Sequence, residues 1–77
     1  MSIPLFAVVT LRRDDGETGV PAGAEGTVVA VHGNGEAYTV EFFDGSGDTI
    51  EASLLRDYRP EELAVKWRPE APALPPE

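Results

Sequence analysis

The strongest constraint on the fold is a pair of apolar segments joined by a short glycine-rich turn. Residues 27–31 (TVVAV) and 37–43 (AYTVEFF) are rich in β-branched and aromatic residues, and the sequence HGNG at 32–35 separates them. Such segments predict strands, and the two glycines tolerate the positive φ angles of a tight turn. The sequence therefore predicts a β-hairpin. By the two-residue period of a strand, its buried face carries Tyr38, Val40 and Phe42.

Further short elements flank this hairpin. Residues 5–11 (LFAVVTL) predict an earlier strand, residues 49–55 a fourth strand, and residues 64–67 (AVKW) a last one. A helical turn is predicted at 60–63, because proline suits the first helical position. The residues that share one face of these strands are Ala7, Val9 and Leu11, then Ile50, Ala52 and Leu54, and finally Val65 and Trp67.

Segments rich in turn-forming residues separate these elements. Residues 12–25 predict a long loop, and residues 44–48 (DGSGD) predict a tight turn. Together the elements predict an all-β domain, a small and strongly bent five-stranded barrel with one short helical turn before the last strand. We expect this domain to span residues 1–67. Residues 68–77 predict a Pro-rich extended or disordered tail, because proline lacks the N–H that a sheet needs.

The charge balance limits the classes of partner. The chain has 77 residues, no cysteine, and 14 acidic against 6 basic side chains, which gives a formal net charge of −8. Phosphate backbones attract clusters of lysine and arginine, so nucleic acid and anionic membranes are disfavoured as partners. A basic protein partner is favoured, although a charged surface that keeps a small domain soluble also explains the composition. The absence of cysteine, signal peptide and membrane span predicts a cytoplasmic location.

One block of sequence resembles a known family. Residues 20–29 (VPAGAEGTVV) followed by 38–42 (YTVEF) resemble an uncharacterised bacterial family of small SH3-like barrels, known only as a domain of unknown function. The resemblance extends over residues 6–60, and that family more often has leucine where Tyr58 stands. It implies an SH3-like barrel and supplies no activity, cofactor or site.

A shorter pattern resembles two other protein classes. Gly23, Gly26 and Val28 form a GxxGxV sequence that is similar to KOW motifs and to the barrel of the nitrile hydratase β-subunit. The first resemblance implies an association with nucleic acid, which the sign of the charge disfavours. The second implies a structural component of a metalloenzyme, for which this chain supplies no ligands.

The histidine and the glycine-rich turns do not predict a catalytic site. His32 is the only histidine, and catalysis would require a neighbouring nucleophile or acid that the sequence around it does not supply. We expect it to be a turn residue, for which Glu36 across the same hairpin turn is a candidate ion-pair partner and not a member of a triad. The turns at 33–35 and 45–47 lack the lysine and the following helix of a phosphate-binding loop. The chain is therefore predicted not to be an enzyme and to have no cofactor.

The turn at 44–48 has an incomplete resemblance to a calcium loop. Asp44, Ser46 and Asp48 alternate like the first ligands of such a loop. However, Thr49 and Leu55 stand where the loop needs glycine and glutamate. Aspartate and serine are also common turn formers, so we predict a turn and no metal site.

Four arginines leave two interpretations open. Brought together by the barrel, they could hold a carboxylate or a phosphate. Alternatively, each pairs with a surface acid, and such exposed pairs add little stability. The arginines are Arg12, Arg13, Arg56 and Arg59, and the acids considered are Asp14, Asp15 and Asp57.

Aromatic and acidic residues near the end of the second hairpin strand predict a partner-binding surface. Phe43 follows Phe42, so in a regular strand only one of the two side chains can face the core. An exposed aromatic often marks an interface, although Phe43 could instead pack under the loop at 14–24. We expect Trp67 to close one end of the barrel, while keeping it among the candidates. The predicted partner-binding residues are Phe43, Glu41, Asp44, Asp48 and Trp67.

These observations favour a non-catalytic protein-binding module, or an accessory subunit of a larger bacterial protein. A neutraliser of a basic toxin or nuclease, similar to an antitoxin or immunity protein, and a KOW-like nucleic-acid-associated domain are the alternatives. Unpaired strand edges could also pair two copies into a homodimer. The PxxP sequences that begin at Pro69 and Pro72 resemble ligands of aromatic grooves, but a Pro-rich tail produces them by chance.

Overall fold

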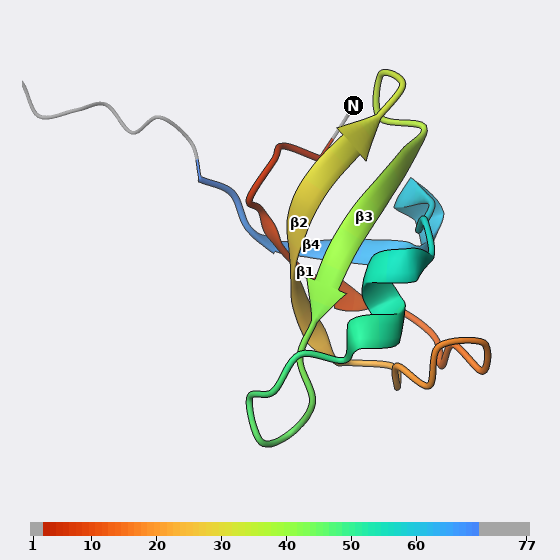
Figure 1. The fold of residues 1–77 in the computed structure, drawn as a ribbon. Helices are drawn as coiled ribbons and strands as arrows, with labels where there is room; N and C mark the ends of the chain where they lie inside the picture. Colours follow the sequence, from red (N-terminus) through yellow and green to blue (C-terminus); the bar gives the residue numbers. More distant parts are fainter. Residues whose placement is uncertain (1–2, 70–77) are drawn as a thin grey trace, which may run out of the picture.

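The computed structural model describes residues 3–69, which form one antiparallel sheet with two short 3₁₀ helices (Figure 1). In chain order the elements are β1 (Val8–Leu11), β2 (Glu25–His32), β3 (Ala37–Phe42), η1 (Glu51–Leu55), η2 (Pro60–Glu62) and β4 (Leu63–Trp67). The strand order is β3-β2-β1-β4, so β3 and β4 are the two edges. The predicted all-β class is confirmed, and the predicted tail lies outside the described residues from position 70 onward. Within 3–69, no helix has the length and apolar character needed to cross a membrane.

One face of the sheet forms the core. The predicted inner faces of the hairpin and the first strand are confirmed by the burial of Tyr38, Val40 and Phe42, and of Ala7, Val9 and Leu11. The other buried apolar residues are Ile3, Val20, Val28, Tyr58 and Leu63. Burying one such aliphatic or aromatic side chain contributes about 1.5–3 kcal/mol, so this face supplies most of the stability of a small domain.

The prediction of a strand at residues 49–55 is wrong, and the predicted number of five strands is therefore wrong as well. This segment contains the 3₁₀ helix η1 instead. Its buried Ser53 hydroxyl donates a hydrogen bond to the Ile50 carbonyl at 2.8 Å and accepts one from the Phe42 N–H at 3.1 Å. A side-chain oxygen therefore takes the place of a strand carbonyl beside β3, and the chain turns where a strand would continue.

The four-stranded sheet does not close into a barrel. After η1 the chain crosses the outer edge of β3, where Tyr58 and Tyr38 form an isolated antiparallel bridge with N–H···O distances of 2.7 and 2.8 Å. Helix η2, which begins at Pro60 as predicted, then leads to β4 beside β1 on the opposite edge. The bridge covers part of the β3 edge, while β4 remains the other edge of the sheet.

A β-bulge decides which face Trp67 occupies. Val9 pairs with Val65 and Val8 pairs with Trp67, so Lys66 is an extra residue in β4. The extra residue shifts the alternation and places Trp67 on the outer face, where it is 56% exposed. Val65 packs against the core. The predictions that Val65 and Trp67 share a face, and that Trp67 closes one end of the barrel, are therefore wrong.

The first strand begins at Val8, later than the predicted Leu5. The preceding residues form a turn in which the Ala7 N–H donates to the Pro4 carbonyl at 3.1 Å. Phe6, the third residue of this turn, has a φ of 69°. This left-handed conformation is one that glycine or asparagine usually adopts at the third position of such a turn, so the backbone at Phe6 is strained.

Candidate functional site

The structure brings together four of the five predicted partner-binding residues. At the end of β3 and in the turn after it lie Glu41, Phe43, Asp44 and Asp48. Trp67 lies in β4, at the other edge of the sheet. Glu41 and Trp67 belong to one cross-strand row through Thr27 and Val8, but three strand spacings, about 14 Å, separate them. Trp67 therefore shares the outer face of the sheet with Glu41 but lies outside the group at the end of β3.

The acidic turn holds its own shape through Asp44. One carboxylate oxygen of Asp44 accepts the N–H groups of Ser46 at 2.8 Å and of Asp48 at 3.0 Å. The Glu41 carboxylate accepts the Thr49 hydroxyl at 2.7 Å. These bonds agree with the prediction that the segment is a turn. Within residues 3–69, no group of three or more potential ligand side chains could hold a metal ion.

Phe43 has the intermediate position that the alternation predicts. Phe42 is fully buried, whereas Phe43 is half-buried and lies outside the core cluster. The Phe43 N–H donates to the Glu25 carbonyl at 3.0 Å. Its side chain lines a groove together with Gly19 and Pro21, so the long loop covers part of it and leaves the rest accessible.

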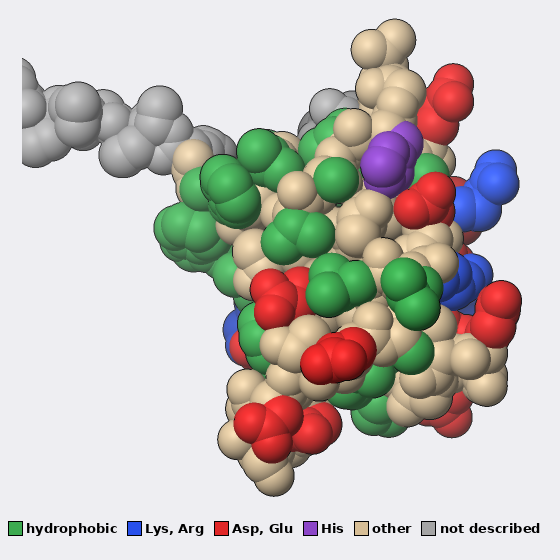
Figure 2. All heavy atoms as spheres, viewed as in Figure 1, with side chains coloured by type: hydrophobic (Ala, Val, Ile, Leu, Met, Phe, Trp, Pro, Cys, Tyr) green, Lys and Arg blue, Asp and Glu red, His purple; other side chains and the backbone are tan. Residues whose placement is uncertain are grey.

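This groove lies between residues 19–25 and residues 43–50. Phe43, Ile50 and Pro21 provide apolar surface, while Asp44 provides a carboxylate and Glu25 a second one that is paired with Lys66 outside the lining. No basic side chain is part of the lining contributed by the described residues. Figure 2 shows acidic side chains gathered over the end of β3 and the turn at the bottom of the view. The groove, which we call the acidic groove, suits an apolar group that carries a positive charge.

A second set of polar residues forms a network around Asp15. The Asp15 carboxylate accepts the Thr18 hydroxyl at 2.6 Å and the Tyr58 hydroxyl at 2.9 Å. Arg56 places one nitrogen 3.2 Å from Asp15 and another 2.9 Å from the Glu62 carboxylate. The Arg56 guanidinium also lies over the Tyr58 ring, 4.5 Å from its centroid. This Asp15 cluster therefore ties the long loop to η2 and to the bridge residue beside β3.

The environment of the cluster shifts its pKa values. Burial opposes ionisation of Asp15, but two hydroxyl donors, the Glu17 N–H and the charge of Arg56 outweigh it and hold the pKa of Asp15 below 3.8. Burial also opposes ionisation of Glu62, while the Arg59 N–H and Arg56 lower the pKa of Glu62 below 4.5. The hydrogen bond to Glu62 raises the pKa of Arg56. Asp15, Glu62 and Arg56 are therefore all ionised at neutral pH, while burial raises the pKa of Tyr58 and keeps its hydroxyl a neutral donor.

These shifts predict that the domain loses stability in acid. Asp15 and Glu62 titrate at lower pH in the folded chain than in the unfolded chain, so their contribution is present above the unfolded values of 3.8 and 4.5. It is lost as the pH falls through the folded values. We expect the free energy of unfolding, measured with urea by circular dichroism, to fall below about pH 5. The Asp15→Asn variant should show a smaller fall, and an equal fall in both proteins would contradict this assignment.

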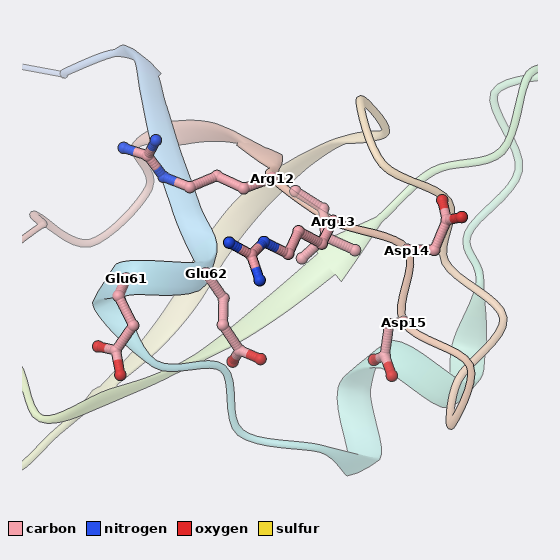
Figure 3. Close-up of a pocket in the computed structure, with 7 residues that line it drawn as sticks. Arg12, Arg13, Asp14, Asp15, Glu61 and Glu62 are labelled. Atoms are coloured by element: carbon pink, nitrogen blue, oxygen red, sulfur yellow. The ribbon is translucent and has the colours of Figure 1, made fainter.

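The interpretation that arginines pair with acids is confirmed for two of the four. Arg56 pairs within the Asp15 cluster, and Arg59 lies 3.2 Å from Glu61. Figure 3 shows a second groove, which lies beside the Asp15 cluster. The lining of this second groove includes Arg12 and Arg13 but also four carboxylates. The Arg12 Nε donates to the Leu63 carbonyl at 3.1 Å. The carboxylates outnumber the guanidinium groups, so this groove does not suit a phosphate or carboxylate ligand.

His32 has a different neighbour from the one predicted. Its Nε2 lies 2.8 Å from the Thr39 hydroxyl and 3.5 Å from the Asp57 carboxylate, so the expected pairing with Glu36 is wrong. Both contacts involve the same ring nitrogen. A nucleophile–histidine–acid relay needs the two partners on different nitrogens. The group is therefore a surface contact without the geometry of a catalytic triad.

Local sequence patterns could not reveal the Asp15 cluster as a unit. Asp15 is separated by 41 residues from Arg56 and by 43 from Tyr58. The available signal was local: Asp15 accepts the Glu17 N–H at 2.9 Å and the Thr18 hydroxyl, a turn pattern typical of aspartate. That pattern predicts the turn but does not predict the arginine that crosses to it.

Comparison with known proteins establishes a family for this chain. No curated protein and no solved structure matches it. The family model described as Domain of unknown function (DUF4926) matches residues 5–63, which include the acidic groove and the Asp15 cluster. This match confirms the resemblance to an uncharacterised family and does not confirm the likeness to KOW motifs or to the nitrile hydratase β-subunit. The chain belongs to DUF4926, a family of domains of unknown function.

Proposed function

We propose that this domain is a non-catalytic protein-binding module that holds an extended, positively charged segment of a partner protein in the acidic groove. The observation that supports this proposal is the composition of the groove, where Phe43, Ile50 and Pro21 lie beside the Asp44 carboxylate and residues 3–69 contribute no basic side chain to the lining. An accessory subunit that anchors a larger protein would use the same surface.

The chemistry of the groove suggests how a basic segment would be recognised. A lysine or arginine carries an apolar stem and a charged head, so its stem can pack on Phe43 while its head approaches Asp44. Asp48 lies in the same turn, outside the lining, and adds exposed negative charge nearby. A cation near an aromatic face is also favourable by about 0.5–1 kcal/mol at exposed sites. The net charge of −8 would attract such a segment from a distance and raise the association rate.

The finer fold and the location are part of this proposal. We propose that the bent sheet is an incomplete SH3-like barrel, which is supported by two features: the bulges in β1–β4 and β2–β3, and the helical turn before the last strand. The absence of cysteine supports a cytoplasmic location.

Selection from a random displayed-peptide library tests the proposal, with the domain as the immobilised target. We expect the recovered peptides to be enriched in lysine and arginine next to apolar residues. A selected peptide, measured by titration calorimetry, should bind Phe43→Ser at least tenfold more weakly, which corresponds to about 1.4 kcal/mol. Asp48→Lys should weaken binding mainly at low salt, because it reverses an exposed charge.

A matched control distinguishes this groove from general hydrophobic adhesion. Leu55 is 90% exposed and lies in η1, outside the groove lining. Leu55→Ser should therefore retain full affinity, and all three variants should keep the circular dichroism spectrum of the folded domain. Recovery of peptides without basic enrichment, or equal affinities for Phe43→Ser and the unmodified domain, would overturn the proposal.

A further inference from the structure

A second surface, on the outer face of the sheet, carries an apolar patch that the acidic groove does not use. The exposed apolar residues there are Leu5, Phe6, Val29 and Trp67. The register places them together, because Val8 pairs with Trp67 and the Phe6 N–H donates to the Val28 carbonyl at 2.7 Å, next to Val29. Figure 2 shows hydrophobic side chains gathered at the left of the view, over the segment before β1 and the end of β4. We call this surface the outer patch.

Phe6 is unfavourable in the isolated chain for two independent reasons. Its side chain is 57% exposed to solvent. Its backbone is left-handed, with a φ of 69°, which costs a residue with a Cβ roughly 1–2 kcal/mol. Glycine would remove both costs at this position. The backbone of Phe6 is strained and its aromatic side chain is exposed. Strain of this kind, kept at an exposed aromatic residue, indicates an interaction that offsets its cost.

The charges around the outer patch distinguish it from the rest of the molecule. Lys66 pairs with Glu25, and exposed Arg68 follows Trp67, so two cations and one carboxylate lie at this rim. Over the whole chain, carboxylates outnumber cations, and the formal net charge is −8. Two copies of the chain would repel each other through most orientations. Approach through the outer patch brings together surfaces that carry Lys66 and Arg68, so the repulsion is weaker in this orientation.

We propose that the outer patch is the interface of a symmetric homodimer, in which the occupant of the patch is the same patch of a second copy. A two-fold axis lets Phe6 and Trp67 of one copy meet the same residues of its partner, which is the self-complementarity that such an interface needs. A standard interface buries about 800 Å² per partner. The outer patch has four exposed apolar residues and adjoins the half-buried row that contains Val8 and Thr27, and we expect micromolar affinity.

Analytical ultracentrifugation of the full chain, from low micromolar to millimolar concentration, tests this proposal. We expect a monomer that converts to a dimer as concentration rises. The chain has one tryptophan. Its fluorescence emission should shift to shorter wavelength over the same range of protein concentration, because Trp67 leaves water when the dimer forms. Phe6→Gly should weaken the dimer at least tenfold, and Trp67→Ser should do the same.

Phe6→Gly also separates the interface from a folding effect. At concentrations where both proteins are monomers, this variant should unfold at a higher urea concentration than the unmodified chain, because the strain at residue 6 is removed. Leu55→Ser should leave the dimer unchanged. A chain that stays monomeric at millimolar concentration overturns the proposal. A dimer that Phe6→Gly and Trp67→Ser leave intact also overturns it, because the interface then lies elsewhere.

Discussion

Replacing Gly26 by alanine is expected to lower the free energy of unfolding by about 2–3 kcal/mol, because the new methyl group would overlap the core. A Cβ at this position would lie 2.7 Å from a methyl group of Val40 and 2.8 Å from the Phe42 ring. It would also lie 2.9 Å from the Glu41 carbonyl oxygen. The last neighbour is backbone, so relief would require β2 and β3 to separate at their closest point.

A second glycine provides the matched control. Gly45, in the turn after β3, has no positive φ and has no neighbouring atom within 4 Å of the Cβ position. Gly45→Ala should therefore change the free energy of unfolding by less than about 0.5 kcal/mol. Urea unfolding followed by circular dichroism measures both variants. Similar midpoints for Gly26→Ala and Gly45→Ala would show that the approach of β2 to β3 is looser than described.

Replacing Arg56 by methionine is expected to destabilise the domain by about 2–3 kcal/mol at neutral pH, somewhat below the cost of breaking a fully buried ion pair. Methionine keeps most of the side-chain volume but leaves Asp15, whose side chain is 9% exposed, without its cation. Glu62 loses the same partner. The loss in the free energy of unfolding should become smaller as the pH falls, because protonated carboxyl groups no longer need the positive charge of Arg56.

Arg59→Met is the matched control for this variant. The Arg59 side chain pairs with Glu61 on the surface, where both side chains are largely exposed. Exposed pairs of this kind contribute between 0 and about 1 kcal/mol, so we expect a change near the lower limit. Thermal unfolding at neutral and acid pH distinguishes the two substitutions. Equal losses for Arg56→Met and Arg59→Met would mean that the Asp15 cluster is no more than a surface contact.

The alternation of side chains along the sequence predicted the parts of the fold that depend on a regular period. Tyr38, Val40 and Phe42 are buried as expected, because β3 is regular from end to end. The hairpin turn and the turn at Asp44 were also predictable, since glycine and aspartate favour such conformations locally. In the same way, the adjacent Phe42 and Phe43 predicted that one aromatic would lie outside the core.

The errors arose where one residue breaks the period. Ile50, Ala52 and Leu54 alternate like a strand, but the Ser53 hydroxyl bonds the edge of β3 and bends the chain into η1. Alternation over so few residues does not distinguish a strand from a short helix. The extra residue Lys66 places Trp67 on the opposite face of the sheet from the one that the alternation predicts. Neither a bulge nor a side-chain substitute for a strand carbonyl has a signature in local hydrophobicity.

The candidate sites were predictable to different degrees for the same reason. The acidic groove is built on a turn and the strand next to it, so local patterns identified Glu41, Phe43, Asp44 and Asp48 as neighbours. Pro21, from the long loop, and Glu25, from the start of β2, complete the groove, and their position beside Phe43 depends on tertiary packing. The outer patch depends on the left-handed turn at Phe6 and on the bulge at Lys66. Both are features that composition and periodicity do not report.

The position of β1 between β2 and β4 has a consequence for the order of folding. β2 and β3 are joined by a tight turn and can pair early, because closing a short loop costs little entropy. β1 pairs on one side with β2, across the long loop, and on the other with β4, whose residues are 52 to 59 positions further along the chain. Non-local pairings of this kind form slowly. The last step of folding would therefore dock β4 and close the Asp15 cluster, and until then the inner edge of β1 would be open to other chains.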